Sequence, residues 1–153
     1  MTKTLQVLLA STAVVVFCAT PAFAQRNVGI RAGVSADPDQ FFFGGHYETQ
    51  PLLRRVTFRP NVEVGVGDGL TTIALNFEFV YSIRLEGKPA RVYMGGGPAA
   101  NIYIDRGRDD DTDVAPGFNF LIGVQHDRGL FGELKLGAID SPDIKFTIGY
   151  AFR

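Results

Sequence analysis

Apolar and polar side chains alternate along most of this chain. From Arg55 to Val66, valine, phenylalanine and proline occupy the even positions, whereas arginine, threonine, asparagine, glutamate and glycine occupy the odd ones. The segments from Thr71 to Leu85 and from Ile144 to Arg153 repeat this alternation. A period of two places the apolar side chains on one face of a β-strand and the polar side chains on the other. These three segments are therefore predicted to be amphipathic strands.

Five further segments follow the same alternation less strictly. They are Val28–Val34, Phe41–Glu48, Val92–Ile104, Phe118–Gln125 and Glu133–Leu136. Turn-forming residues separate the segments, for example Asp37-Pro38-Asp39 and Ser141-Pro142-Asp143, and the longest connection is expected from about Asp105 to Pro116. The pattern thus predicts an all-β chain of eight antiparallel strands that are connected in sequence order.

Two prolines lie inside predicted strands. Pro60 and Pro98 each lack the N–H group that a ladder hydrogen bond needs. We expect a bulge or a local break in the sheet beside each of them.

The first segment differs from the rest of the chain. Lys3 is followed by an apolar run from Leu5 to Phe17, and Pro21-Ala22-Phe23-Ala24 places small residues at the two positions that a signal peptidase reads. This order is typical of a secretory signal peptide, and the run is shorter than the ~20 residues of a membrane-spanning helix. Residues 1–24 are therefore predicted to be a cleaved signal peptide, and residues 25–153 to form one domain.

The composition agrees with strands and adds two exclusions. Glycine (18 residues) and phenylalanine (13) are abundant in a chain of 153 residues; glycine disfavours helix interiors, whereas phenylalanine favours pleated surfaces. The formal charge of -1 excludes a strongly basic surface of the kind that binds nucleic acid. Cys18 is the only cysteine and lies in the predicted signal peptide, so residues 25–153 can form no disulfide and no thiolate metal site.

Two features of the alternation indicate that the polar face points inward. The interior of an eight-stranded barrel is just wide enough to be filled by side chains, and the apolar face carries too many phenylalanines and tyrosines for that space. On the polar face, glycines alternate with long charged side chains, as a crowded interior requires. The predicted fold is an eight-stranded antiparallel up-and-down transmembrane β-barrel with its apolar side chains toward lipid.

The charges on the polar face nearly balance, which supports a buried network because a buried charge needs a partner. The predicted lumen network consists of the bases Arg31, Arg55, Arg59, Arg84, Lys135 and Lys145 and the acids Glu48, Glu63, Glu78 and Glu133. Such a network would pack the lumen with paired charges.

The predicted signal, the eight alternating segments and the stretch from Lys145 to Phe152 resemble those of small bacterial outer-membrane β-barrels, namely the transmembrane domain of outer-membrane protein A and its eight-stranded relatives. The resemblance covers residues 25–153. It implies location in the cell outer membrane, contact with outer-membrane lipid and lipopolysaccharide, and a C-terminal signal, Tyr150 and Phe152, for the barrel-assembly machinery. The chain departs from the family pattern in placing Arg153 after Phe152 and in lacking tryptophan, so an interfacial aromatic girdle must consist of phenylalanine and tyrosine.

This resemblance and the packed lumen together predict a structural or surface-interaction role for a monomer without cofactor or nucleic-acid partner. Two other functions are compatible with the same alternation. A narrow pore for ions or small solutes would differ only in a continuous water path through the lumen. A soluble periplasmic barrel of the lipocalin type would turn its phenylalanine-rich face inward and carry a lipid there.

A nucleophile and a base occur near each other at only one end of the predicted lumen. Ser82 and His46 are expected at that end, with Glu48 nearby, and these are residue types that a hydrolase uses. Ser35 and Ser141 are expected at the opposite rim. We interpret Ser82 and His46 as lumen-filling polar residues, and the protein is not expected to be an enzyme.

Three aspartates have the alternate spacing of a calcium-binding loop. Asp109, Asp111 and Asp113 show this spacing, but Val114 stands where the turn glycine is needed and Phe120 where the bidentate glutamate is needed. We interpret them as a solvated surface loop. A metal site at these aspartates, or a divalent-cation bridge from them to lipopolysaccharide, is the alternative.

Overall fold

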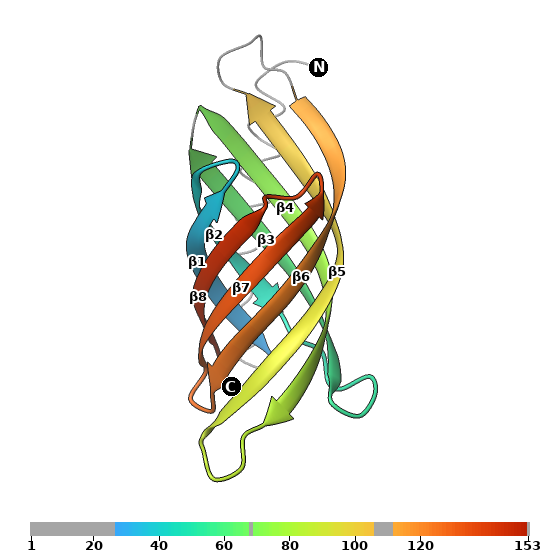
Figure 1. The fold of residues 1–153 in the computed structure, drawn as a ribbon, viewed down its shortest axis with the longest axis vertical. Coiled ribbons are helices and arrows are strands. Elements are labelled where there is room, and N and C mark those ends of the chain that lie inside the picture. Colours follow the sequence, from blue (N-terminus) through green and yellow to red (C-terminus); the bar gives the residue numbers. More distant parts are fainter. Residues whose placement is uncertain (1–26, 68, 106–111, 153) are drawn as a thin grey trace, which may run out of the picture.

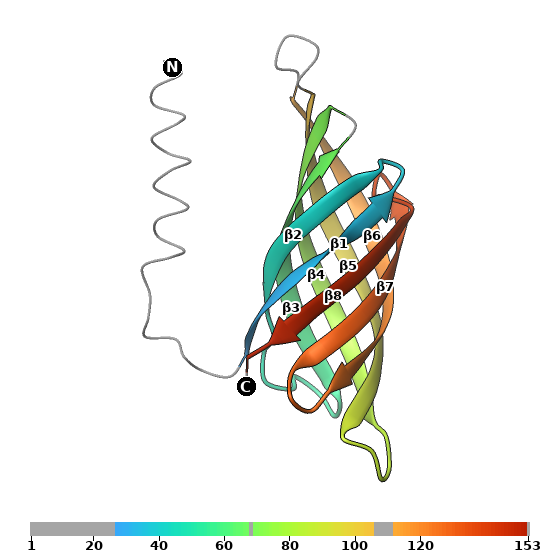
Figure 2. The same cartoon turned by 90° about the vertical axis from the view of Figure 1, so that its left-hand side faces the viewer.

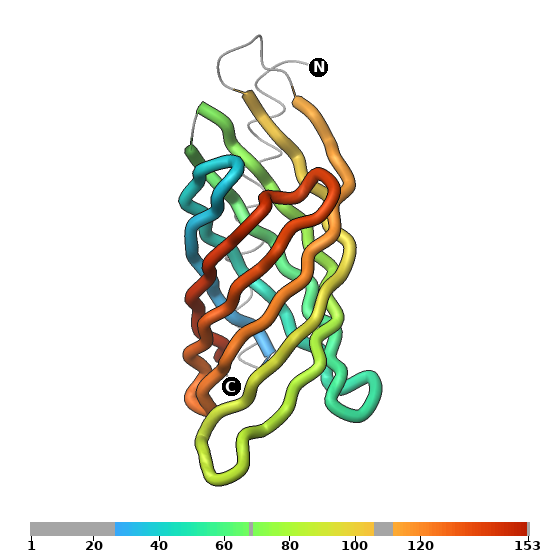
Figure 3. Tube along the Cα trace, in the orientation of Figure 1, coloured from blue at the N-terminus to red at the C-terminus, as the bar shows by residue number. Residues whose placement is uncertain are grey.

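The chain forms a closed β-barrel in which all neighbouring strands are antiparallel (Figure 1). The computed structural model describes residues 27–67, 69–105 and 112–152. The strands are β1 (Val28–Ala36), β2 (Gln40–Tyr47), β3 (Val56–Gly67), β4 (Leu70–Arg84), β5 (Ala90–Asp105), β6 (Thr112–His126), β7 (Leu130–Ile139) and β8 (Ile144–Ala151). Each strand pairs with the next one in the sequence and β8 pairs with β1, as the tube in Figure 3 shows. The prediction of an eight-stranded up-and-down barrel is confirmed.

The first and the last strand meet at one end of the barrel. The N–H group of Phe152 donates a hydrogen bond of 2.8 Å to the carbonyl oxygen of Val28. We call the end that holds these two residues the lower end, as it is drawn in Figure 2, and the opposite end the upper end. The connections β2–β3, β4–β5 and β6–β7 therefore lie at the lower end, and the remaining connections lie at the upper end.

The hairpin of β5 and β6 is longer than the sequence pattern predicts. Ile104 pairs with Thr112 and Tyr103 pairs with Asp113, so the ladder continues well above the level at which the alternation weakens. The prediction of a connection that reaches Pro116 is wrong in its second half, because residues 112–116 belong to β6. In Figure 1 this hairpin extends above β1, β2, β7 and β8.

The predicted break beside Pro98 is present. The ladder between β4 and β5 runs as far as Asn76 and Ala99 and resumes at Phe79 and Gly96, so the pairs between them are missing. The register is the same on both sides of this gap, so the chain has a local break here and no bulge.

A second break lies beside Pro60. This residue pairs with Phe77 of β4, but the ladder between β2 and β3 ends at His46 and Asn61, one step before the proline. The missing N–H group of Pro60 explains why the ladder stops there.

The distribution of side chains is the reverse of that in a soluble protein. Charged residues such as Arg59, Glu63 and Lys135 are almost completely buried in the lumen, whereas Phe146 and Ile148 are exposed on the outer surface. The strict alternation along each strand produces this distribution, because successive side chains point to opposite sides of the barrel wall. Within the described ranges, no helix is long and apolar enough to cross a membrane.

Candidate functional site

The lumen contains a network of buried ion pairs, in which three bases surround Glu63 of β3. Its carboxylate lies 3.1 Å from Arg31 Nη1, 2.9 Å from Lys135 Nζ and 2.9 Å from Lys145 Nζ. These bases come from β1, β7 and β8, and Glu63 is only 1% exposed. One carboxylate therefore connects four strands across the upper half of the lumen.

Glu133 of β7 holds the lower half of the network together. Its carboxylate pairs with Arg59 of β3, lies 3.4 Å from Arg31 Nη1, and accepts a hydrogen bond of 2.9 Å from the hydroxyl group of Tyr93. The guanidinium group of Arg59 also lies 4.8 Å from the centroid of the Tyr93 ring. The buried guanidinium group of Arg59 is thus stabilised by both a carboxylate and the face of an aromatic ring.

Glu78 of β4 completes the set of buried acids. Lys135 Nζ lies 2.7 Å from its Oε1, and Arg59 Nε lies 3.9 Å from its Oε2. The amide of Asn61 donates a hydrogen bond of 2.9 Å to Oε2 of the same carboxylate. The side-chain oxygen of Asn61 accepts a hydrogen bond of 2.7 Å from the side-chain amide of Asn76. A chain of hydrogen-bonded amides therefore continues from the charged groups.

The network contains three acids and four bases, and each charged group has a partner of opposite sign at 3.4 Å or less. Pairing is required here because an isolated charge in such a site costs several kcal/mol. Of the ten residues predicted for the network, the structure brings these seven together: Arg31, Arg59, Glu63, Glu78, Glu133, Lys135 and Lys145.

Two predicted members, Arg55 and Arg84, lie outside the lumen, and for them the prediction is wrong. Arg55 precedes β3, is exposed and has a φ of 68°, which interrupts the strand pattern. Arg84 is the last residue of β4; its side chain is 76% exposed and pairs with Asp127 at 2.9 Å. Alternation predicts an inward-facing side chain only where the strand is part of the barrel wall. Arg55 and Arg84 lie beyond the lower end of that wall.

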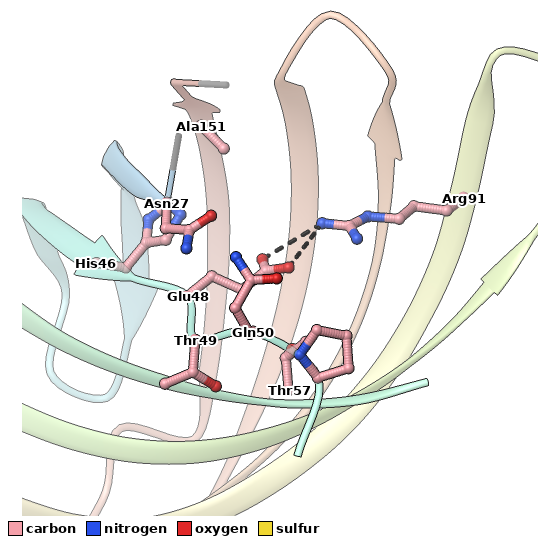
Figure 4. A pocket seen from close by; sticks show the side chains of 9 residues that line it. Asn27, His46, Glu48, Thr49, Gln50, Thr57, Arg91 and Ala151 are labelled. Atoms are coloured by element: carbon pink, nitrogen blue, oxygen red, sulfur yellow. Dashed lines mark hydrogen bonds and ion pairs between the residues drawn. The ribbon is translucent and has the colours of Figure 1, made fainter. Parts of the chain in front are cut away.

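Glu48, the tenth predicted residue, lies apart from the network in a hollow at the lower mouth of the barrel. The hollow has a volume of about 520 Å³ and is lined by His46, Thr57 and Arg91 among others (Figure 4). Arg91 of β5 reaches across it to Glu48 at 3.0 Å. The predicted network omitted Arg91, although it has the same parity in β5 as the lumen-facing Tyr93.

The lumen leaves little space beside Glu63. Near the upper end, a cavity of about 10 Å³ is lined by Phe42, Glu63 and Lys145 among others. Phe131 fills a further part of the lumen, and the centroid of its ring lies 5.7 Å from the guanidinium carbon of Arg31. Its parity in β7 is that of Glu133, so the alternation could have identified it as a lumen residue.

Ser82 and His46 do not form a nucleophile–base pair in the described part of the chain. His46 is buried, and its ring meets that of Phe131 edge to face, with 5.4 Å between the centroids. The backbone N–H group of Ser82 donates to the carbonyl oxygen of Arg55 at 2.9 Å. His46 is thus packed as a lumen residue, and Ser82 lies at the lower end of β4.

Of the three aspartates with the calcium-loop spacing, the structure describes one. Asp109 and Asp111 lie outside the described residues, and Asp113 is exposed on β6 opposite Tyr103. Among the residues that the structure describes, no three His, Cys, Asp or Glu side chains are grouped so that they could hold a metal ion.

The aromatic residues of the C-terminal stretch face outward. Tyr150 and Phe152 are both exposed, and their rings pack at 5.3 Å between centroids. They lie at the lower end, beside the start of β1.

Comparison with known proteins finds solved structures with a similar fold. No protein-family model and no curated protein sequence matches the chain. The solved structure of the N-terminal β-barrel domain of Pseudomonas aeruginosa OprF superimposes with a TM-score of 0.63 at 15% identity, covering 84% of this chain and 97% of that one. Neisserial surface protein A (NspA) gives a TM-score of 0.62 at 12% identity, covering 80% of this chain and 90% of that one. At these identities, the two similarities establish a shared barrel fold.

Proposed function

We propose that this protein is an integral β-barrel of the cell outer membrane with a structural or surface-interaction role and no catalytic activity. The observation that supports this most is the reversal of burial: the ion pairs of Glu63, Glu78 and Glu133 are sealed inside, and apolar side chains cover the outside. Soluble monomers rarely expose apolar patches larger than a few hundred Å². A closed barrel satisfies its backbone groups in lipid, which makes a membrane the environment in which this surface is stable.

The proposed orientation places the lower end in the periplasm. Both β1 and β8 have their free ends there, as expected for an even number of strands in a bacterial barrel. The upper connections would then face outward, toward lipopolysaccharide. Export by a signal peptide in residues 1–24 remains part of the proposal, and this segment lies outside the described residues.

The arrangement of the lumen supports a closed barrel over the two other functions considered. In a lipocalin-type carrier the apolar face would surround a ligand, but here Phe79, Phe120 and Phe146 point outward. A narrow pore would need a water path past Arg31, Lys135 and Glu63, whose side chains meet across the lumen. We therefore infer that the lumen stabilises the barrel and does not conduct.

We propose two kinds of partner for the outer surface, namely membrane lipid and the machinery that inserts barrels. Outer-membrane lipid would cover the apolar band, and Tyr150 and Phe152 would present an aromatic C-terminal signal to the barrel-assembly machinery. We propose a monomer, without cofactor.

Two measurements on the expressed full chain test the proposal. The protein should stay in membranes washed with alkaline carbonate, and it should migrate faster on SDS gels when it is not boiled, because a closed barrel resists detergent. In planar bilayers the purified protein should give no conductance steps. Recovery in the carbonate-soluble fraction would contradict the membrane location, and regular conductance steps would favour the pore.

A further inference from the structure

Exposed charges are sorted between the two ends of the barrel. Of the residues that the structure describes, the lower end carries the exposed bases Arg54, Arg55, Arg84, Lys88 and Arg128, together with the acids Glu86 and Asp127. Among the described residues of the upper connections, all charged side chains are acidic, namely Asp37, Asp39, Asp140 and Asp143. Within the part of the chain that the structure describes, the exposed bases of the connections therefore gather at the lower end.

Tyrosines mark a level just above these bases. Tyr47, Tyr81 and Tyr150 all point outward from the lower part of the wall. Tyrosine prefers the boundary between hydrocarbon and headgroups, because its apolar ring can contact the acyl chains while its hydroxyl group is hydrated. Val56 pairs with Tyr81, so Arg55 comes just one residue beyond this boundary. Arg55 thus lies at the depth where lipid phosphates are found.

Three of the bases line one open hollow. Arg55, Arg84 and Lys88 surround a volume of about 540 Å³ between the start of β3 and the β4–β5 turn, together with Glu86 and Asp127. Arg84 is paired with Asp127, but neither Arg55 nor Lys88 has an ion-pair partner among the described residues. Two cationic groups are therefore available for a phosphate, whose oxygens suit both guanidinium and ammonium groups.

The β2–β3 connection, which also carries Arg55, presents two exposed leucine side chains. Leu52 and Leu53 are 58% and 71% exposed. Their N–H groups both donate to the carbonyl oxygen of Val56, at 2.8 and 3.5 Å, so the turn that presents them is hydrogen-bonded. In Figure 1 this β2–β3 connection reaches out beyond the barrel wall. Exposed leucines next to arginines are typical of a segment that rests in a membrane interface.

We propose that Leu52, Leu53, Arg54, Arg55, Arg84 and Lys88, here called the lower-end patch, bind the phosphate headgroups of anionic phospholipids in the adjacent leaflet. The inference rests on the proposed membrane location and adds a lipid preference to it. The leucines enter the acyl region, and Arg55 and Lys88 contact one headgroup in the hollow. Each base that lies near an anionic lipid surface strengthens the association with that lipid roughly fivefold.

Lipid selectivity measured by spin-label EPR tests this inference. The full protein is refolded into phosphatidylcholine vesicles, and the association of spin-labelled phosphatidylglycerol is compared with that of spin-labelled phosphatidylcholine. Phosphatidylglycerol should be preferred, and the variant R55Q/K88Q should lose roughly fivefold of this preference for each base removed. R128Q is the matched control, because Arg128 is an exposed base of the same end that does not line the hollow. An equal loss in R128Q, or no preference in the unmodified protein, would overturn the inference.

A second comparison separates a lipid headgroup from a free phosphate. If the ligand belongs to a bilayer, L52N/L53N should lower the preference for phosphatidylglycerol, and inorganic phosphate should compete poorly. Full displacement by inorganic phosphate with unchanged selectivity in L52N/L53N would overturn the lipid assignment. A barrel that inserts without selectivity contradicts this inference alone, whereas failure to insert into any vesicle contradicts the proposed function as well.

Discussion

Glu63 is one of two acids in the lumen that each pair with three bases. Three bases, Arg31, Lys135 and Lys145, lie within 3.1 Å of its carboxylate. The lumen already holds one more base than acid, so the loss of one negative charge here cannot be balanced by a neighbour. The stability of the barrel should therefore be more sensitive to this carboxylate than to any exposed acid.

The substitution E63Q tests this dependence, because glutamine keeps the shape of the side chain and removes only its charge. We expect a loss of about 3–5 kcal/mol in the free energy of unfolding, since three buried bases lose a partner. Urea titration of the barrel in lipid vesicles measures this loss. E86Q at the exposed β4–β5 turn is the control and should stay within about 0.5 kcal/mol. A loss below about 1 kcal/mol in E63Q would indicate that water reaches the network.

Residue-level prediction from the sequence succeeded where the chain lies within the barrel wall and failed at its edge. Parity placed Glu63, Glu78 and Glu133 correctly on the inner face. The same rule misplaced Arg84, because β4 continues beyond the lower rim and its last side chain enters water. Arg91 has the inner parity as well, but it was missed because the predicted segment began at Val92, whereas β5 begins at Ala90.

At the scale of the strand, glycine decides how closely neighbouring chains approach. Gly97 of β5 is buried beside the break at Pro98, and a Cβ atom there would collide with the carbonyl oxygen of Phe77 and approach Glu78 Cα to 3.0 Å. Gly132 of β7 faces outward, and a Cβ atom there would meet nothing within 4 Å. The abundance of glycine thus has different causes in different places.

The pair G97V and G132V separates these causes. G97V should destabilise the barrel by about 1–3 kcal/mol or prevent its closure, because the added side chain has to displace backbone of β4. G132V should be neutral, since valine is well accommodated on an exposed strand surface. The fraction of protein with the faster mobility of the unboiled form on gels measures closure. Equal behaviour of the two variants would contradict a tightly packed inner wall.

The number of strands, their order and their inward and outward faces followed from the alternation. The strand ends did not: the β5–β6 hairpin includes residues 112–116, which the sequence assigned to a loop because Pro116 and the preceding polar residues break the pattern. Cross-strand pairing with β5 overrides that local signal. This pairing is a long-range property, which a local pattern does not contain.

For the whole molecule, the reversal of burial distinguishes a membrane barrel from a soluble one. Predicting it required a comparison of the bulk of the apolar face with the width of an eight-stranded interior. The sorting of exposed charges between the two ends was not predicted, because a sum over the sequence gives only a net charge near zero. Closure of the barrel determines which connections share an end, and only then do the bases of the lower end appear as a group.

A pair of arginine substitutions tests the position of the barrel in a bilayer. Ile148 lies halfway along β8, pairs with Ala32 of β1 and is 61% exposed, whereas Val114 lies in the upper extension of β6 and is similarly exposed. I148R should cost about 2–4 kcal/mol in lipid vesicles, because an arginine near the bilayer midplane is poorly solvated, and V114R should cost at most about 1 kcal/mol near the interface. Reversible urea unfolding of both variants in vesicles measures the difference. A soluble barrel would accept either arginine at its surface within about 0.5 kcal/mol, so a small and equal effect would contradict the membrane location.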